Sequence, residues 1–129
     1  AARLAEGRLS GRTVTSTGLE TVDGRRVPDH LVQAADELGV DMRSHRSTRA
    51  QRAHIDTADL ILIMDPLNYD ILRRRHPEAL DKVLFLGLFG DSPSLTIPDP
   101  VLMDEQDTLA TIRTIRDAVD RLVRWLGGE

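Results

Sequence analysis

The chain has 129 residues, 40% hydrophobic and 29% charged, which fits one domain that buries its own core. Its formal net charge of −4 argues against a dedicated nucleic-acid binder, because no basic excess is present to contact phosphates. The absence of cysteine excludes a disulfide scaffold, a thiolate metal site and a thiol nucleophile within these residues. No signal peptide and no apolar run of ~18 residues is present, so we expect a cytoplasmic protein without a membrane partner.

Arginine dominates the basic residues, and Lys82 is the only lysine. The arginines form small clusters with acids close by in the sequence, such as Arg25 and Arg26 before Asp29. Mixed charge of this kind is typical of solvated surfaces with local ion pairs. The clusters by themselves therefore predict no binding site.

The first third of the chain predicts helices on either side of a strand. Residues 1–9 have the pattern of a helix already under way, and the short β-branched segment 12–16 predicts a strand. A proline at a first helical position and the apolar spacing after it predict a helix over residues 28–38. Gly39 then ends this helix as a left-handed C′ glycine.

The middle of the chain predicts a buried strand between two helices. A short helix is expected to begin near Thr48, with Gln51 completing a capping box. Residues 58–65 form a near-continuous apolar run, which is typical of a strand covered on both faces. Asp65 is placed to cap a helix over residues 66–76. Three residues of that helix are expected to face inward: Leu67, Ile71 and Leu72.

The last third predicts a second buried strand over residues 83–89 and a long amphipathic helix over residues 104–126. Asp117 and Asp120 each have an arginine four residues further on, and this spacing predicts two ion pairs along the helix. Alternating helices and strands predict a doubly wound α/β domain with a parallel sheet. Three of its strands are visible in this chain.

Asp99 lies between Pro98 and Pro100, in the loop that follows the predicted strand 83–89. Each proline holds φ near −65° and biases the preceding residue toward extended geometry, so the carboxylate has little freedom. Open α/β sheets place their ligands against loops of this kind. An acid held there can protonate a leaving group, which makes Asp99 the first catalytic candidate. A rigid surface turn is the alternative interpretation.

Four ordered stretches resemble the low-molecular-weight protein tyrosine phosphatase family. They are residues 15–18 (Thr-Ser-Thr-Gly), residues 39–47, residues 58–65 together with Asn68, and residues 97–100 (Ile-Pro-Asp-Pro). Each stretch alone is a weak signal, whereas the ordered set is specific and spans nearly the whole chain. The resemblance implies a four-stranded parallel sheet in the order 2-1-3-4, helices on both of its faces, and no cofactor.

The family's first strand and its phosphate loop, of the form Cys-x-x-x-x-x-Arg-Ser, have no counterpart in these residues. Residues 1–9 resemble the helix that follows this loop. We therefore expect residues 1–129 to be a single phosphatase-like domain that lacks its N-terminal part. The chain as given is then expected to be inactive. Because the missing strand is central in the sheet, the chain is also expected to fold poorly or to recruit a strand.

The reaction that the resemblance implies is hydrolysis of a phosphomonoester, with protein phosphotyrosine or a small phosphoester as substrate. A cysteine outside the given residues attacks phosphorus, and Asp99 protonates the leaving oxygen before acting as base for water. Ser16 and His45 match family positions that hold the phosphate loop in shape. A loop histidine without a special role explains His45 equally well.

The pocket wall departs from the family pattern. Family members usually have aromatic residues directly after the Asp-Pro pair, and this chain has Val101 and Leu102 there. Aromatic walls hold a phosphotyrosine ring by stacking, each contact worth ~1 kcal/mol. Aliphatic walls therefore favour another phosphoester or a broader range of substrates.

Two other functions stay open besides the phosphatase. An inactive pseudo-phosphatase would keep the fold as a binding or assembly module. A receiver-like signalling domain is the more remote alternative, because residues 60–66 resemble a phosphoacceptor strand. Receivers also need an acidic pair after the first strand and a lysine after a later one. Neither Ser16-Thr17 nor Lys82 meets this need. The oligomeric state is not predicted.

Overall fold

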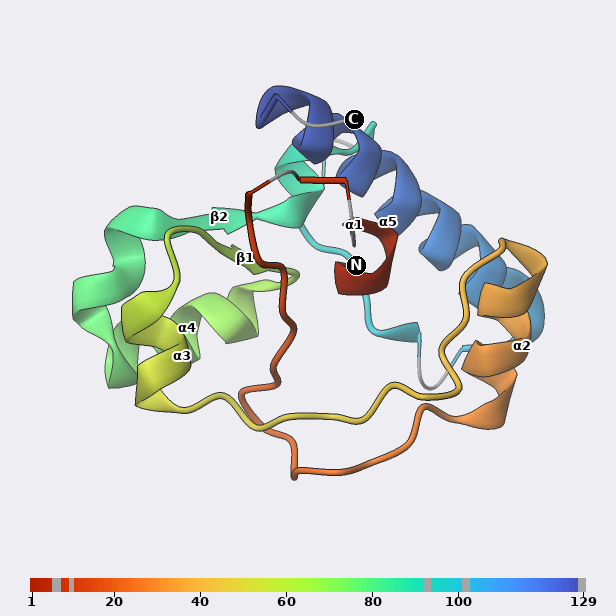
Figure 1. The fold of residues 1–129 in the computed structure, drawn as a ribbon, viewed down its shortest axis with the longest axis horizontal. Coiled ribbons are helices and arrows are strands. Elements are labelled where there is room, and N and C mark those ends of the chain that lie inside the picture. The colour runs from red at the N-terminus through yellow and green to blue at the C-terminus, as the bar shows by residue number, and fades with distance from the viewer. Residues whose placement is uncertain (6–7, 10, 92–93, 101–102, 128–129) are drawn as a thin grey trace.

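The computed structural model describes the chain except for residues 6–7, 10, 92–93, 101–102 and 128–129 (Figure 1). In the described part, short helices and strands alternate before one long C-terminal helix. No helix in these ranges has both the length and the apolarity needed to cross a membrane. The helices and strands, with η for a 3-10 helix, are α1 (Ala2–Ala5), α2 (Asp29–Glu37), α3 (Arg52–Thr57), β1 (Ile61–Ile63), α4 (Pro66–Arg75), η1 (Pro77–Lys82), β2 (Val83–Phe85), η2 (Leu86–Phe89) and α5 (Glu105–Trp125).

The sheet of the described residues consists of β1 and β2, which pair in parallel. Ile61 lies opposite Val83 and Ile63 lies opposite Phe85. The chain crosses from β1 to β2 through α4 and η1, as a parallel pair requires. The predicted α/β fold with a parallel sheet is confirmed.

Helices cover both faces of this sheet (Figure 1), because neighbouring residues of β1 point to opposite sides. Leu60, Leu62 and Met64 pack against a core formed by α1, η2 and α5. Ile61 and Ile63 belong to a second core with α3, α4 and η1. The near-continuous apolar run of residues 58–65 is therefore explained by two separate hydrophobic cores.

Residues 12–16 were predicted to form a strand, but they form none in the structure. In the structure they run outside the sheet, and the side chains of residues 11–17 are exposed. β-branched residues favour extended backbone, but a strand also needs a neighbour for its N–H and C=O groups. The first pairing comes at Gly18, whose N–H donates to the Thr48 carbonyl at 2.8 Å and whose carbonyl accepts from Ala50 at 2.9 Å.

The predicted capping box of the short helix α3 is wrong. The helix begins at Arg52 with Gln51 as its N-cap, and Gln51 pairs with His54 rather than with Thr48. The Gln51 N–H donates to His54 Nδ1 at 2.9 Å, while the Gln51 side chain accepts from the His54 N–H. The loop before α3 is instead held by pairing with Gly18, so the helix begins later.

The start of α4 confirms one prediction and corrects another. Asp65 caps the helix, because its carboxylate accepts the Asn68 N–H at 2.8 Å. Ile71 and Leu72 are buried as expected. Leu67 was expected to face inward, but it lies in the first turn of α4 and is 60% exposed.

Candidate functional site

The loop that carries Asp99 is anchored at the carboxyl end of β1. The Ile97 side chain is buried, and its N–H donates to the Met64 carbonyl at 2.8 Å. Further back, the Leu95 backbone lies directly over Gly87, where a side chain would collide with it. Asp99 itself is exposed two residues beyond the Ile97 anchor. Asp99 thus follows an anchor at the carboxyl end of β1, the end of the strands at which open α/β folds bind ligands.

The structure brings Ser16 and His45 together at one open pocket of about 220 Å³. The two residues are far apart in the sequence, and the pocket between them is rich in hydroxyl groups. Asp99 is not among the residues that line it. The lining residues are Ser16, Thr17, Gly18, Thr21, His45, Ser47 and Thr48.

Two neighbouring loops build this pocket. The Gly24 N–H donates to the Ser47 carbonyl at 2.8 Å, and the Ser47 N–H donates to the Arg25 carbonyl at 2.9 Å. The Ser47 hydroxyl also donates to the Val22 carbonyl at 2.6 Å. Gly24 has a φ of 83°, which a residue with a side chain rarely adopts. The two loops therefore hold each other through their backbones, with Ser47 at the centre.

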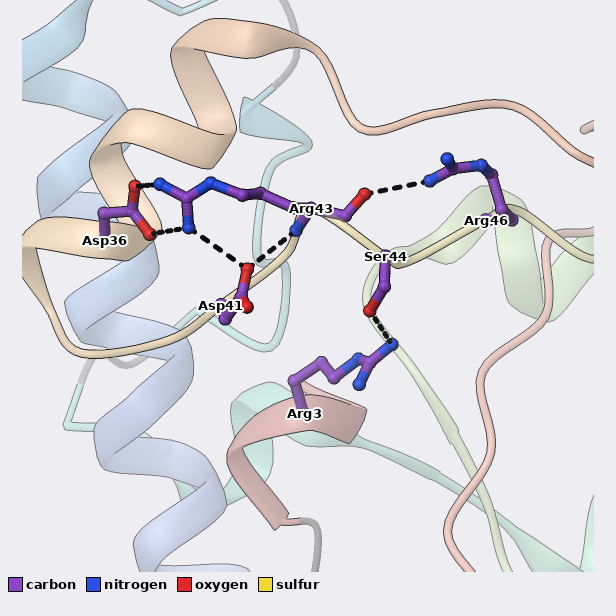
Figure 2. A network of polar contacts seen from close by, with 6 residues as sticks. All are labelled: Arg3, Asp36, Asp41, Arg43, Ser44 and Arg46. Carbon is purple, nitrogen blue, oxygen red and sulfur yellow. Dashed lines mark hydrogen bonds and ion pairs between the residues drawn. The ribbon is translucent and has the colours of Figure 1, made fainter.

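A network of arginines and aspartates fixes the turn that leads to His45 (Figure 2). The Arg43 guanidinium contacts both carboxylate oxygens of Asp36 near the end of α2, and it also reaches Asp41 at 3.2 Å. Arg46 then donates to the Arg43 and His45 carbonyls, each at 2.9 Å. The backbone N–H of Arg43 lowers the pKa of Asp41, and the guanidinium adds to this effect. Arg43 is thus tied to α2, and Arg46 on the other side of His45 is tied to Arg43.

His45 is half-buried, and its surroundings favour the neutral imidazole. Burial lowers its pKa, and the positive charges of Arg3 and Arg46 lower it further. Arg3 extends from α1 toward the same turn, with its guanidinium 3.5 Å from the Ser44 hydroxyl (Figure 2). A neutral imidazole has one donor and one acceptor, which suits a bridging role between polar groups.

Asp65 and Asn68 contribute to the site through the backbone. Asp65 caps α4, and the Asn68 side chain accepts the Met64 N–H at 3.3 Å. Because the Met64 carbonyl accepts from Ile97, this small cap supports the anchor of the Asp99 loop. Val101 and Leu102, the predicted pocket wall, lie outside the described residues. In the described ranges, no group of three or more His, Cys, Asp or Glu residues could hold a metal ion.

Gly87 is a positioning residue that the sequence analysis missed. A Cβ built on it would lie 2.6 Å from the Leu95 carbonyl carbon and 2.9 Å from its Cα, which is too close for a real contact. The signal was present, since a single glycine inside a predicted strand often marks a close approach of another backbone. Gly87 is therefore required for the path of the Asp99 loop.

The fold is that of a known class of enzymes. The profile of the family described as low molecular weight phosphotyrosine protein phosphatase matches residues 1–129. The chain belongs to this family of protein phosphatases. The predicted resemblance is confirmed, and the receiver-like alternative is excluded by the family match.

The names of known proteins of similar sequence describe enzymes that act on phosphorylated proteins. The chain is 30% identical over 123 residues to a protein-arginine-phosphatase from Geobacillus stearothermophilus, covering 95% of this chain and 80% of that protein. It is also 30% identical over 122 residues to EpsP of Ralstonia solanacearum, a probable low molecular weight protein-tyrosine-phosphatase. That match covers 92% of this chain and 82% of EpsP.

Solved structures agree with this family. The YwlE arginine phosphatase from Geobacillus stearothermophilus superposes with a TM-score of 0.87 at 30% identity, covering 98% of this chain and 82% of its own. The tyrosine phosphatase Wzb from Escherichia coli K30, solved with sulphate, has a TM-score of 0.89 at 25% identity. It covers 98% of this chain and 87% of its own.

Proposed function

We propose that this protein hydrolyses phosphorylated residues of proteins through a cysteinyl-phosphate intermediate, with Asp99 as general acid. The observation that carries the proposal is the anchored Ile97–Asp99 segment at the carboxyl end of β1, in a chain of this phosphatase family. The nucleophilic cysteine and the phosphate-binding arginine are proposed to lie outside the 129 residues, because these contain no cysteine.

The proposed reaction has two steps in which Asp99 moves one proton each way. In the first, a thiolate forms a bond to phosphorus while the bond to the leaving group breaks, and protonated Asp99 gives its proton to that leaving atom. In the second, ionised Asp99 takes a proton from water as the water attacks phosphorus. The sulfur–phosphorus bond then breaks, which releases phosphate and restores the thiolate and the protonated acid.

Ser16 and His45 are proposed to support the phosphate loop from the pocket they share. The Ser16 hydroxyl and a neutral His45 imidazole can each donate and accept a hydrogen bond, which suits the contacts of a loop rich in backbone N–H groups. The exposed segment 12–17 supports the same proposal. A further strand next to this segment would pair backbone groups that have no strand partner among the described residues.

Phosphotyrosine and phosphoarginine are the two substrate classes to compare, since relatives named for each match this chain. In both, an acid at the position of Asp99 can protonate the leaving atom, which is oxygen in one and nitrogen in the other. The absence of aromatic residues at positions 101 and 102 favours the substrate without an aromatic ring. The cytoplasmic location stays a prediction of the sequence.

The first experiment is the intact mass of the natural protein, followed by its activity on p-nitrophenyl phosphate, phosphotyrosine and phosphoarginine. A mass well above the 14.4 kDa of this chain, with hydrolysis of one of these substrates, is the expected result. A mass equal to 14.4 kDa would leave the protein without a thiol nucleophile. That result would overturn the proposal in favour of an inactive relative that works as a binding or assembly module.

A further inference from the structure

Four exposed arginines on two neighbouring loops differ from most other arginines of the chain. They are Arg25, Arg26, Arg46 and Arg49, and we call them the arginine surface. None of the four forms an ion pair with a described residue. By contrast, eight arginines elsewhere among the described residues form ion pairs with acids: Arg8, Arg43, Arg52, Arg73, Arg74, Arg75, Arg116 and Arg121. The local pairing expected from the sequence holds for Arg43, Arg73 and Arg74 but not for Arg25 and Arg26.

The backbone holds the arginine surface together. Arg26 and Arg46 form an antiparallel bridge, and Arg49 forms a parallel bridge with Gly18. The nearest acid in these loops, Asp23, already accepts the Arg49 backbone N–H at 2.7 Å. Arg46 uses one guanidinium nitrogen for two backbone carbonyls. The four positive charges are thus displayed by a fixed backbone and are not neutralised by neighbouring side chains of the described residues.

The arginine surface borders the candidate site. Arg46 and Arg49 lie on the same loop as His45, Ser47 and Thr48, which line the pocket that Ser16 shares. Arg25 is joined to Ser47 by hydrogen bonds in both directions, since its N–H donates to the Ser47 hydroxyl at 3.0 Å and its carbonyl accepts from the Ser47 N–H. Because this pocket is proposed to support the phosphate loop, a polypeptide whose phosphorylated residue binds to that loop would pass near these side chains.

We propose that the arginine surface recognises acidic residues that flank the phosphorylated residue of a protein substrate. Guanidinium groups bind carboxylates through paired, charge-assisted hydrogen bonds, so a segment rich in Asp or Glu matches the four exposed charges. That the partner is a substrate rests on the proposed function, whereas the binding of an acidic segment to the arginine surface does not. A protein partner fits better than a nucleic acid. The net charge is −4 and neither loop has a Phe, Tyr or Trp on which a base could stack.

The test measures binding of unphosphorylated peptides to the complete natural protein by fluorescence anisotropy. One labelled peptide has a tyrosine flanked by glutamates, and the other has glutamines in their place. We expect the glutamate peptide to bind about tenfold more tightly at about 50 mM salt, and this preference to shrink at about 200 mM salt. Equal binding of the two peptides would overturn the proposal.

A pair of matched variants locates the binding. Arg25→Gln with Arg26→Gln should weaken binding of the glutamate peptide about fivefold, because each lost surface pair costs a few tenths to 1 kcal/mol. Arg113→Gln with Arg124→Gln removes the same charge from exposed positions of α5 and should leave binding unchanged. Equal loss in both double variants would show a mere effect of net charge and would sink the proposal. Circular dichroism checks that each variant folds.

Two further arms separate this inference from its alternatives. The first arm measures binding of an oligothymidylate. If it binds as tightly as the glutamate peptide, and this binding is lost in the Arg25→Gln, Arg26→Gln variant, the arginine surface is a nucleic-acid site. Asp99→Asn should bind the glutamate peptide like the parent chain, because the binding step uses no proton transfer. The two proposals can therefore fail separately. An inactive protein that still prefers the glutamate peptide contradicts only the proposed catalysis, and an active protein without this preference contradicts only the role of the arginine surface.

Discussion

The backbone of Leu95 lies against Gly87 at a distance that leaves no room for a side chain on the glycine. Gly87 is buried in η2, directly after β2, and Leu95 leads to the buried Ile97. The contact joins the second strand of the sheet to the loop that carries Asp99. The position of the candidate acid thus depends on a glycine twelve residues earlier in the chain.

Gly87→Ala should destabilise the protein by ~1–3 kcal/mol, because the added methyl forces two backbones apart in a packed region. The free energy of unfolding in urea measures the loss. Gly90→Ala is the matched control. Among the described residues its Cβ would meet only the Gly87 carbonyl oxygen, at 3.4 Å, so we expect a much smaller effect. Equal stability of the two variants would mean that the loop can move without cost.

Asp99→Asn should lower turnover of p-nitrophenyl phosphate about 10²- to 10⁴-fold in the complete natural protein, since an amide cannot supply the proton. The loss should appear mainly in kcat rather than in KM, because the carboxyl group acts on the leaving atom. Asp81→Asn, an exposed acid in η1, controls for the change in net charge. Unchanged kcat in Asp99→Asn would favour the alternative interpretation, in which Asp99 is part of a rigid surface turn without a catalytic role.

His45 should make stability depend on pH in a defined direction. Burial and the charges of Arg3 and Arg46 hold its pKa below the ordinary value of about 6.5, so the unfolded chain binds the proton more readily. The contribution of His45 to stability is therefore complete above pH 6.5. It declines as the pH falls from there through the lowered pKa of the folded protein. His45→Gln should remove this part of the decline in urea melts.

The charge of Arg3 can be tested on the same histidine. Arg3→Gln should raise the pKa of His45 toward its ordinary value, because a nearby cation is removed while the burial remains. A proton NMR titration of the imidazole signals measures the pKa directly. Arg124→Gln, which changes the charge at the far end of α5, should leave the titration of His45 unchanged. A pKa that does not move in Arg3→Gln would contradict the role of this charge.

The Asp65 cap should contribute ~1 kcal/mol to stability, the usual value for a carboxylate that accepts a helix N–H. Asp65→Ala removes the acceptor for the Asn68 N–H and should lower the free energy of unfolding by this amount. Asp65→Asn keeps a side-chain oxygen at the same place and should retain most of it. If both variants match the parent in urea denaturation, the cap has no measurable role.

Predictions based on neighbouring residues in the sequence agree best with the structure. Asp65 caps α4, and Gly39 ends α2 with a φ of 77°. Each of these features depends on groups within about four positions of one another, so the local sequence contains the whole interaction. The approximate bounds of the long helix α5 follow from its apolar periodicity in the same way.

Predictions that required a choice among partners agree less well. The spacing along α5 predicted that Asp117 and Asp120 pair with arginines four residues on. In the described residues, Asp120 pairs instead with Arg8 at 2.6 Å, and Arg121 pairs with Asp91. A partner four positions away in the helix and a partner from a distant segment compete for the same charged side chain. An exposed pair is worth at most about 1 kcal/mol, so packing decides which one forms.

The sequence by itself determined the family, the alternation of helices and strands, the doubly covered strand β1 and the candidate acid Asp99. These depend on ordered motifs, on periodicity and on the stiffness of two prolines, all of which are local properties. Only the tertiary structure decided that residues 12–16 run outside the sheet, that Ser16 and His45 line one pocket, and that Gly87 holds the Asp99 loop. Each of these depends on contacts between segments distant in the chain, which no local pattern specifies. Backbone hydrogen bonds join the two pocket loops, and the buried Ile97 anchors the Asp99 loop at Met64.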